Sequence, residues 1–412
     1  MTPRPRQRET VVGGGVYARG VLTTLAVAGY RSLRDLVLPL RPLTLVTGAN
    51  GSGKSSLYRA LRLLADASRN GAIPALAREG GLPSTLWAGP EKIGRAVRDG
   101  RHPVQGTART KPVALRLGFA ADDFGYAIDL GLPVPTPTMF DRDPEIKREC
   151  LWAGPVLKPS ALLVDRAAGV VRTRDENGAW SAERYPIGLT DSMISEFANP
   201  RAAPELVVLR ERIRSWRFYD QFRTDALAPA RLGQVGTRTP VLGHDGADLA
   251  AAIQTIREVG DVEALDRAVD DAFPGCRVRV VAGEGRFDLL FHQHGLVRPL
   301  TAAELSDGTL RYLLLVAALL TPRPPELLVL NEPETSLHPD LLPPLAALIT
   351  TATARTQIVV VSHSEPLLRA MSAIGDELGL DVGTVALVKD FGETTIDGQG
   401  PLDGPPWHWP KR

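Results

Sequence analysis

The sequence predicts an α/β fold in which a mostly parallel core sheet is accompanied by an antiparallel sheet and a helical second lobe. Three observations predict this fold class. A glycine-rich run separates an apolar strand from a helical segment within residues 43–64. A second apolar strand ends in two polar residues, Asn331 and Glu332. Between these parts, turn-rich stretches alternate with more regular segments over residues 71–275.

The glycine-rich run fits the phosphate-binding loop pattern G-x-x-x-x-G-K-S/T, because it reads Gly48-Ala49-Asn50-Gly51-Ser52-Gly53-Lys54-Ser55. Residues 43–47 read as the strand that enters the loop, and residues 56–64 as the helix that leaves it. The pattern needs glycines because the backbone curls around phosphate oxygens with its N–H groups pointing inward. The predicted nucleotide contacts from this loop are Gly48, Asn50, Gly51, Ser52, Gly53, Lys54, Ser55 and Ser56. We expect Lys54 to reach the β and γ phosphates and Ser55 to bind Mg²⁺.

The second part of the predicted core lies near the end of the sequence. Residues 326–330 form an apolar run of buried-strand type, and Asn331 and Glu332 follow where ligands collect in parallel sheets. A serine and glycine run, Leu305-Ser306-Asp307-Gly308-Thr309, precedes it and opens a predicted helix to Leu320. Another apolar strand, residues 358–361, ends in Ser362-His363.

In this order, these runs resemble the motifs of ABC-type ATPases. Leu305–Thr309 resembles the signature, Asn331-Glu332 the end of the second phosphate-side motif, Ser336-Leu337-His338-Pro339 the D-loop, and His363 the switch histidine. The opening strand at residues 29–33 and the phrase at 331–339 are similar to the soluble RecF-, SMC- and OLD-like branch, which includes AAA_21-like predicted ATPases. The likeness covers residues 21–70 and 276–395 well.

The resemblance implies a P-loop NTPase of ABC-head type that uses ATP and Mg²⁺. Glu332 is then the carboxylate that orients the attacking water, with Lys54 and His363 as the other catalytic residues. Arg31, in the opening strand, is a further expected nucleotide contact. Ser306 and Gly308 would face the phosphate bound by a second chain, so the resemblance implies a head-to-tail homodimer formed on ATP binding.

Two positions depart from the family pattern. Asn331 stands where an Asp is usual; its amide oxygen can still accept a hydrogen bond from Mg²⁺-bound water, but it brings no charge. Either the neutral amide is tolerated, or the chain binds ATP well and hydrolyses it slowly. Thr309 replaces the usual Gln, which is a milder change. Gln105 is the nearest candidate for a Q-loop glutamine, and we do not expect it to serve as one.

We expect the chain to be organised as a flexible tail (1–20), the first part of the head (21–70), an inserted sheet and helical lobe (71–275), the second part of the head (276–395) and an irregular tail (396–412). Within the insertion, residues 113–119 and 125–130 alternate at period two and predict a hairpin. Residues 248–256 and 262–273 predict helices. No heptad run is long enough for coiled-coil arms.

The segment Glu205–Arg223 mixes arginines with aromatic residues. It has two interpretations. The mixture could line a nucleic-acid channel, because arginines bind phosphates and aromatic rings stack on bases. Alternatively, Leu206, Leu209, Ile213 and Trp216 form a core stripe at helical spacing with the arginines solvated opposite, and the local pattern favours this second interpretation.

The composition is that of a soluble globular protein. The formal net charge of +1 over 412 residues does not indicate a nucleic-acid-binding molecule as a whole. Cys150 and Cys276 form no metal motif and indicate a cytoplasmic protein without disulfides. No apolar run is long enough to cross a membrane, and we interpret the arginines before residues 21–28 as an imitation of a signal peptide. His292 and His294 lack a third metal ligand nearby, and no nuclease cluster is evident.

These observations predict an ATPase that dimerises on ATP and is coupled to DNA repair, DNA maintenance or phage defence, by resemblance alone. The alternative is a slow nucleotide switch that controls a protein effector without nucleic acid. DNA and a protein effector therefore both remain open as partners, and no membrane is expected. The energy subunit of a transporter is disfavoured, because the opening strand and the insertion do not resemble that branch.

Overall fold

The computed structural model describes residues 20–90, 112–175, 177–182, 186–197, 199–220, 222–400 and 403–412. Residues 1–19 of the predicted tail and Gln105 lie outside them. Residues 403–412, in the predicted irregular tail, form neither helix nor strand, and Arg412 binds the carboxylate of Asp129 with an N–O distance of 2.7 Å.

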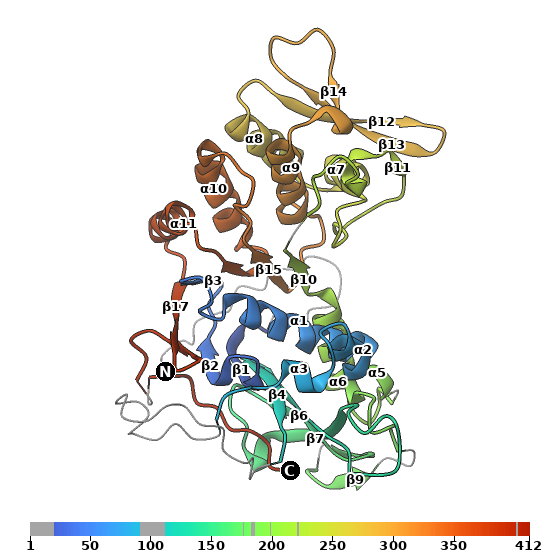
Figure 1. The fold of residues 1–412 in the computed structure, drawn as a ribbon. Coiled ribbons are helices and arrows are strands. Elements are labelled where there is room, and N and C mark those ends of the chain that lie inside the picture. The colour runs from blue at the N-terminus through green and yellow to red at the C-terminus, as the bar shows by residue number, and fades with distance from the viewer. Residues whose placement is uncertain are drawn as a thin grey trace, which may run out of the picture.

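A six-stranded, mostly parallel sheet forms the centre of the molecule (Figure 1). Its strands are β3 (Leu43–Gly48), β10 (Arg217–Tyr219), β15 (Leu327–Asn331), β16 (Gln357–Val361), β17 (Val382–Asp390) and β18 (Glu393–Ile396). They lie in the order β10-β15-β16-β3-β17-β18, and only β17 and β18 pair antiparallel. The strands expected at 43–47, 326–330 and 358–361 are all present. One strand, β10, comes from within residues 71–275.

The register of this sheet brings its polar strand ends together. Asn331 at the end of β15 pairs with Val361 of β16, and Val361 pairs with Val46 of β3. The three chain segments that follow these strands therefore leave the same edge of the sheet, as expected for parallel strands.

A second sheet is antiparallel and has eight strands (Figure 1). They are β1 (Leu22–Tyr30), β2 (Leu33–Pro39), β4 (Leu115–Ala121), β5 (Phe124–Gly131), β6 (Glu145–Ala153), β7 (Leu162–Ala167), β8 (Val170–Arg174) and β9 (Trp180–Ala182). The order is β2-β1-β4-β5-β6-β7-β8-β9. The predicted hairpin is confirmed as β4 and β5, in which Gly118 pairs with Ala127.

The helices fill the space beside the sheets. They are α1 (Lys54–Asn70), α2 (Ala72–Ala77), α3 (Leu82–Thr85), α5 (Met193–Glu196), α6 (Pro204–Ser215), α7 (Leu249–Val259), α8 (Val262–Ala272), α9 (Asp307–Leu319), α10 (Leu342–Ala352) and α11 (Glu365–Leu378). The 3₁₀ turns within the described ranges are η1 (Pro159–Ala161), η2 (Pro229–Arg231), η3 (Ala302–Glu304) and η4 (Pro339–Leu341). The helices predicted at 56–64, 248–256, 262–273 and 309–320 are confirmed as α1, α7, α8 and α9.

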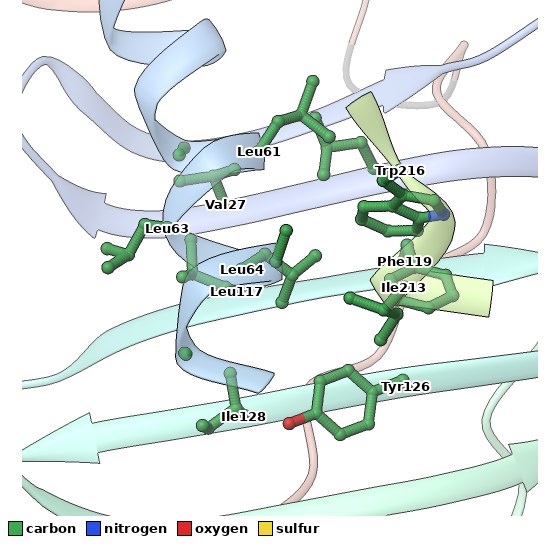
Figure 2. Packing of buried hydrophobic residues seen from close by; sticks show 14 of the residues in the cluster. Val27, Leu61, Leu63, Leu64, Leu117, Phe119, Tyr126, Ile128, Ile213 and Trp216 are labelled. Carbon is green, nitrogen blue, oxygen red and sulfur yellow. The ribbon is translucent and has the colours of Figure 1, made fainter. Parts of the chain in front are cut away.

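The parallel sheet separates two hydrophobic clusters, because successive side chains of its strands point to opposite faces. On one face, α1 packs between this sheet and the antiparallel sheet. Figure 2 shows its Leu61 and Leu64 beside Val27 and Leu117 of the antiparallel sheet, with Trp216 at the far side. On the other face lie α7–α10, and a small sheet caps them (Figure 1). Its strands are β11 (Gln234–Val235), β12 (Arg277–Gly283), β13 (Arg286–His292) and β14 (Leu300–Thr301).

The arginine and aromatic segment forms α6 and β10. The predicted core stripe Leu206, Leu209, Ile213 and Trp216 is buried, as the favoured interpretation requires. The expectation that the arginines lie in solvent is wrong for Arg212, which is 3% exposed and pairs with Asp123 and Glu326 at 2.6 and 2.7 Å. The helical pattern could not reveal this, because both carboxylates come from other elements.

Several smaller expectations can also be compared with the structure. Cys150 and Cys276 are buried free thiols, and burial raises the pKa of Cys150 to about 12. In the described ranges, no group of three or more His, Cys, Asp and Glu residues could hold a metal ion. No helix within those ranges is long and apolar enough to cross a membrane.

The antiparallel sheet contains a fully buried ion pair between Arg166 and Glu149, with an N–O distance of 3.0 Å. We expect Arg166→Met to lower the free energy of unfolding by about 3–5 kcal/mol, because Glu149 would remain as an uncompensated buried charge. Urea unfolding measures this. Arg369→Met, which breaks an exposed pair with Glu365, is the matched control and should unfold like the unmodified protein. Equal stability of both variants would contradict the prediction.

Candidate nucleotide-binding site

The phosphate loop joins β3 to α1 with a backbone that only glycine adopts easily. Gly48, Gly51 and Gly53 have φ angles of 147°, 82° and 113°. Close packing adds a second requirement, since a Cβ atom on Gly53 would lie 2.2 Å from Thr394 Oγ1 and one on Gly48 would lie 2.3 Å from the Leu387 carbonyl oxygen. The loop is therefore fixed in shape by its glycines and by what packs against them.

A pocket of about 280 Å³ opens beside this loop. Its lining is Ser32, Asn50, Gly51, Gly53, Lys54, Ser55, Ser56, Glu332 and Lys389. The structure thus brings most of the predicted loop contacts together with the predicted catalytic carboxylate. Gly48 and Ser52 are not part of this lining.

Two observations fit a triphosphate in this pocket. Lys54 Nζ donates hydrogen bonds to the loop's own carbonyl oxygens, at 2.5 Å to Gly48 and 3.2 Å to Ala49. The Ser52 hydroxyl is buried and has no hydrogen-bond partner in the part of the chain that the structure describes. A buried polar group without a partner is costly, so this hydroxyl is suited to bind a ligand. The helix α1 also begins here without a side-chain cap, which leaves the N–H groups of its first turn free to bind an anion.

Thr394 of β18 holds the loop from behind, and the sequence did not indicate it. Its hydroxyl lies 2.7 Å from the Ser52 carbonyl oxygen and 2.8 Å from the Ser32 hydroxyl, and its N–H donates to the Ser32 carbonyl oxygen at 2.8 Å. Lys389 on the neighbouring strand was also missed. It adds a second ammonium group to the pocket lining, and its only signal in the sequence is a lysine in a chain that mostly uses arginine.

Glu332 lies directly after β15 in a left-handed conformation, with φ of 49°. Its N–H donates to the Val361 carbonyl oxygen at 2.7 Å, and its own carbonyl oxygen accepts from Arg311 at 3.1 Å. The side chain remains 39% exposed and lines the pocket. The main chain on both sides therefore directs the carboxylate into the site.

A larger hollow of about 610 Å³ adjoins the pocket and shares Ser55 and Glu332 with it. Asn331 lines this hollow, so the two predicted metal-site residues, Ser55 and Asn331, face one space. Arg31 lines the hollow as well. Its guanidinium pairs with Glu79 at 2.6 Å, so its expected contact with the nucleotide stays a prediction.

His363 lies between two carboxylates. Its Nδ1 is 3.8 Å from Glu332 Oε1 and 3.5 Å from Glu334 Oε1. Glu334 is 8% exposed and accepts hydrogen bonds from the Ser362 hydroxyl at 2.6 Å and from the His363 N–H at 3.3 Å. Glu334, which was not predicted to be functional, therefore holds the turn that carries His363.

Ser306 and Gly308 line neither of these two cavities. Ser306 caps α9, where its hydroxyl accepts from the Thr309 N–H at 3.1 Å. A Cβ atom on Gly308 would lie 2.9 Å from the Ser336 carbonyl oxygen of the predicted D-loop. Arg231 fixes the turn before α9, since it donates to the Leu305 carbonyl oxygen and pairs with Asp307, both at 2.7 Å.

Solved structures of SMC heads are similar to this chain at low identity. One, described as "Crystal structure of the SmcHead bound to the C-winged helix domain of ScpA", is 13% identical with a TM-score of 0.49, over 91% of this chain and 97% of that one. The SMC head domain from Thermotoga maritima is 16% identical with a TM-score of 0.42, over 91% and 98%. An Smc head from Pyrococcus furiosus, with an extended coiled coil and bound to the C-terminal domain of ScpA, is 13% identical with a TM-score of 0.45, over 91% and 95%.

No curated protein matches the chain. The AAA_21 family model, described as "AAA domain, putative AbiEii toxin, Type IV TA system", matches residues 43–370, which is most of the sequence. Its match includes the phosphate loop, the turn at Glu332 and the start of α9. This chain therefore belongs to the AAA_21 family and has an α/β fold with a phosphate loop between a parallel strand and a helix.

Proposed function

We propose that this chain binds Mg-ATP beside its phosphate loop, pairs head to tail with a second copy, and hydrolyses ATP between the two. The observation that supports this proposal most directly is that the predicted site residues lie in two separate places on the chain. Lys54, Ser55 and Glu332 line one pocket, whereas Ser306 and Gly308 lie elsewhere. One chain thus offers the cradle of one site and the serine-capped helix of another.

Nucleotide binding follows from the groups around the loop. The loop N–H groups and the start of α1 would hold phosphate oxygens. Lys54 would exchange two neutral carbonyl acceptors for charged phosphate oxygens, which form stronger hydrogen bonds with an ammonium group. Bound Mg²⁺ would supply charge neutralisation at the phosphates. Ser55 would bind it directly, and the Asn331 amide oxygen would accept a hydrogen bond from one of its water ligands.

Hydrolysis requires positioning more than covalent chemistry. Glu332 would orient the attacking water, because its carboxylate is exposed in the pocket while its main chain is held on both sides. His363, close to both Glu332 and Glu334, would contact the γ phosphate and report its presence. Glu334 would keep His363 in place through the hydrogen bond to its N–H.

Pairing would depend on ATP because the two chains share each nucleotide. The N-terminal end of α9, with Ser306 as its cap, would contact the phosphate held by the second copy. ATP would stabilise the pair and hydrolysis would release it. We propose that this cycle serves DNA repair, DNA maintenance or phage defence in the reduced environment of the cytoplasm.

A second candidate is a slow switch that controls a protein effector without nucleic acid. Two observations favour it. Asn331 brings no charge to the metal site, and the aromatic rings of the segment Glu205–Arg223 are buried, so they are not available to stack on bases. Binding to duplex or single-stranded DNA across a range of salt concentrations separates the candidates, since phosphate contacts release counterions.

Glu332→Gln should accumulate as a dimer in Mg-ATP, because it keeps the shape of the side chain but cannot polarise the attacking water. We expect turnover to fall about 100-fold or more. Light scattering with ATP and with ADP measures pairing, and phosphate release measures turnover. Glu365→Gln, at an exposed glutamate of α11, is the control and should behave like the unmodified protein. An ATP-saturated monomer would rule the proposed function out.

Ser306→Arg should spare nucleotide binding and abolish pairing and hydrolysis, because the bulky cation would occupy the surface that meets the partner's phosphate. Ser306→Ala loses the same helix cap without the added bulk, so it controls for the cap, whose loss costs about 1 kcal/mol. Binding of a fluorescent ATP analogue is compared with scattering and turnover. Unchanged turnover in Ser306→Arg would contradict the shared site.

Asn331→Asp should lower the Mg²⁺ concentration needed for half-maximal turnover by roughly tenfold, since the carboxylate adds a charge next to the metal's water ligands. Titration of hydrolysis with Mg²⁺ measures this effect. Asn331→Ala removes the amide oxygen and serves as the opposite control. A large rise in maximal turnover in the Asp variant would support the slow switch, and an unchanged Mg²⁺ titration would show that the neutral amide is tolerated.

A further inference from the structure

Arg311 joins the predicted signature helix to the turn that carries Glu332. It lies on α9, and its Nη2 atom donates to the carbonyl oxygens of Glu332 and Asp220, both at 3.1 Å. The residue is 4% exposed. One buried guanidinium group therefore spans three segments that are far apart in the sequence.

The position is costly for a cation. Burial lowers the pKa of Arg311, and the nearby charges of Glu334, Asp220 and Glu332 oppose this effect. Its Nε atom is buried and has no hydrogen-bond partner in the described ranges. If Arg311 contributed only packing, an apolar side chain of similar size could replace it with little or no loss of stability. Its two carbonyl contacts are thus the feature that requires a guanidinium group here.

The contact with Glu332 acts on the orientation of the carboxylate. The N–H of Glu332 donates to the Val361 carbonyl oxygen of β16. Its carbonyl oxygen accepts from the Thr335 N–H within its own turn at 3.2 Å and from Arg311 on α9 at 3.1 Å. The residue is in the left-handed region, where a non-glycine backbone is strained and needs support from its surroundings. Without Arg311, the turn bond from the Thr335 N–H would remain, but nothing from α9 would hold this carbonyl oxygen. The turn, and with it the carboxylate, could then shift relative to α9.

The same helix begins at Ser306. Arg311 lies five residues further along, which is about 7.5 Å along the helix axis. A helix of this length moves as a unit, and Arg231 fixes the turn at its N-terminal end through Leu305 and Asp307. A shift of the Ser306 end is therefore transmitted to the Arg311 side chain.

We propose that Arg311 is a positioning residue for hydrolysis. It lies on the helix that contacts the partner's nucleotide, and it sets the orientation of Glu332 in its own chain. This inference rests on the proposed function. Each chain then links the site where it supplies the serine-capped helix to the site where it supplies the carboxylate.

The second carbonyl contact extends this link to the phosphate-loop helix. Arg311 holds the main chain of Asp220, and the Asp220 carboxylate lies 3.5 Å from Arg62 Nη1 on α1. Residues on α9, at the end of β15 and on α1 are consequently joined through one guanidinium group. A rotation of α9 against α1 would strain both contacts together.

Arg311→Met tests the proposal. We expect turnover to fall about 100-fold, because small displacements of a catalytic group have effects of this size, while the affinity for a fluorescent ATP analogue and ATP-dependent pairing stay unchanged. Arg311→Lys should recover part of the turnover, since an ammonium group can still donate to both carbonyl oxygens. A purely structural role would instead lower affinity, pairing and thermal stability together.

Arg210→Met is the matched control. Arg210 also holds two main-chain carbonyl oxygens, those of Ile194 and Phe197, but it lies on α6 beside the antiparallel sheet. This variant should lose thermal stability and keep its turnover. An equal loss of turnover in both variants would overturn the positioning role.

Mixed dimers show on which chain Arg311 acts. Arg311→Met chains are mixed with Glu332→Gln chains, and wild-type chains with Glu332→Gln chains serve as the reference. If Arg311 positions Glu332 of its own chain, the first mixture has no competent site and stays inactive. If Arg311 acted only through α9 on the nucleotide held by the partner, the Arg311→Met chain would still hydrolyse its own ATP, because its Glu332 and the partner's α9 are both unmodified. The inference would then fail.

Failure of the underlying proposal looks different. Wild-type protein that neither pairs nor hydrolyses ATP would contradict the proposed function, whatever Arg311 does. Wild-type protein that does both, with unchanged turnover in Arg311→Met, would contradict this inference alone.

Discussion

The left-handed backbone of the loop between β3 and α1 is the constraint on which the candidate site depends. Gly48, Gly51 and Gly53 all have positive φ angles, and the Thr394 hydroxyl occupies the space where a side chain at Gly53 would lie. The loop is therefore shaped before any ligand arrives. Phosphate binding then does not have to order the chain, which reduces its entropic cost. The last strand of the sheet, β18, becomes part of the nucleotide site for this reason.

The ladder between β15 and β16 determines the second half of the site. Asn331 pairs with Val361, so Glu332 and His363 emerge from adjacent strands and lie close together. The N–H of Glu332 is held by β16, and its carbonyl oxygen by α9 through Arg311. The direction of the carboxylate is thus a property of the sheet and of the signature helix together. A change in how α9 packs reaches the carboxylate without any change in the sheet.

The sequence predicted those parts of the site whose chemistry lies in contiguous residues. The loop at residues 48–55 and the polar end of β15 are local patterns, and the parallel sheet follows from the apolar strands that precede them. Thr394 and Arg311 could not be predicted, because they act through contacts with residues distant in the chain. A threonine in a short strand has no pattern that marks it as the support of a loop 342 residues away. Arg212 was misjudged because helical periodicity shows one stripe, not the carboxylates that other elements bring to it.

Some of the arginines have a structural role that bears on the choice of partner. Three buried arginines, Arg166, Arg212 and Arg311, hold carboxylates or carbonyl oxygens inside the protein, and so does Arg231, whose side chain is 7% exposed. Guanidinium groups suit this task because their planar donors can satisfy several acceptors at once. The positive charges of these arginines are paired inside the fold and do not face a ligand on the surface. With a formal net charge of +1, the number of arginines is therefore no argument for nucleic acid, and a DNA partner has to be recognised by a local surface.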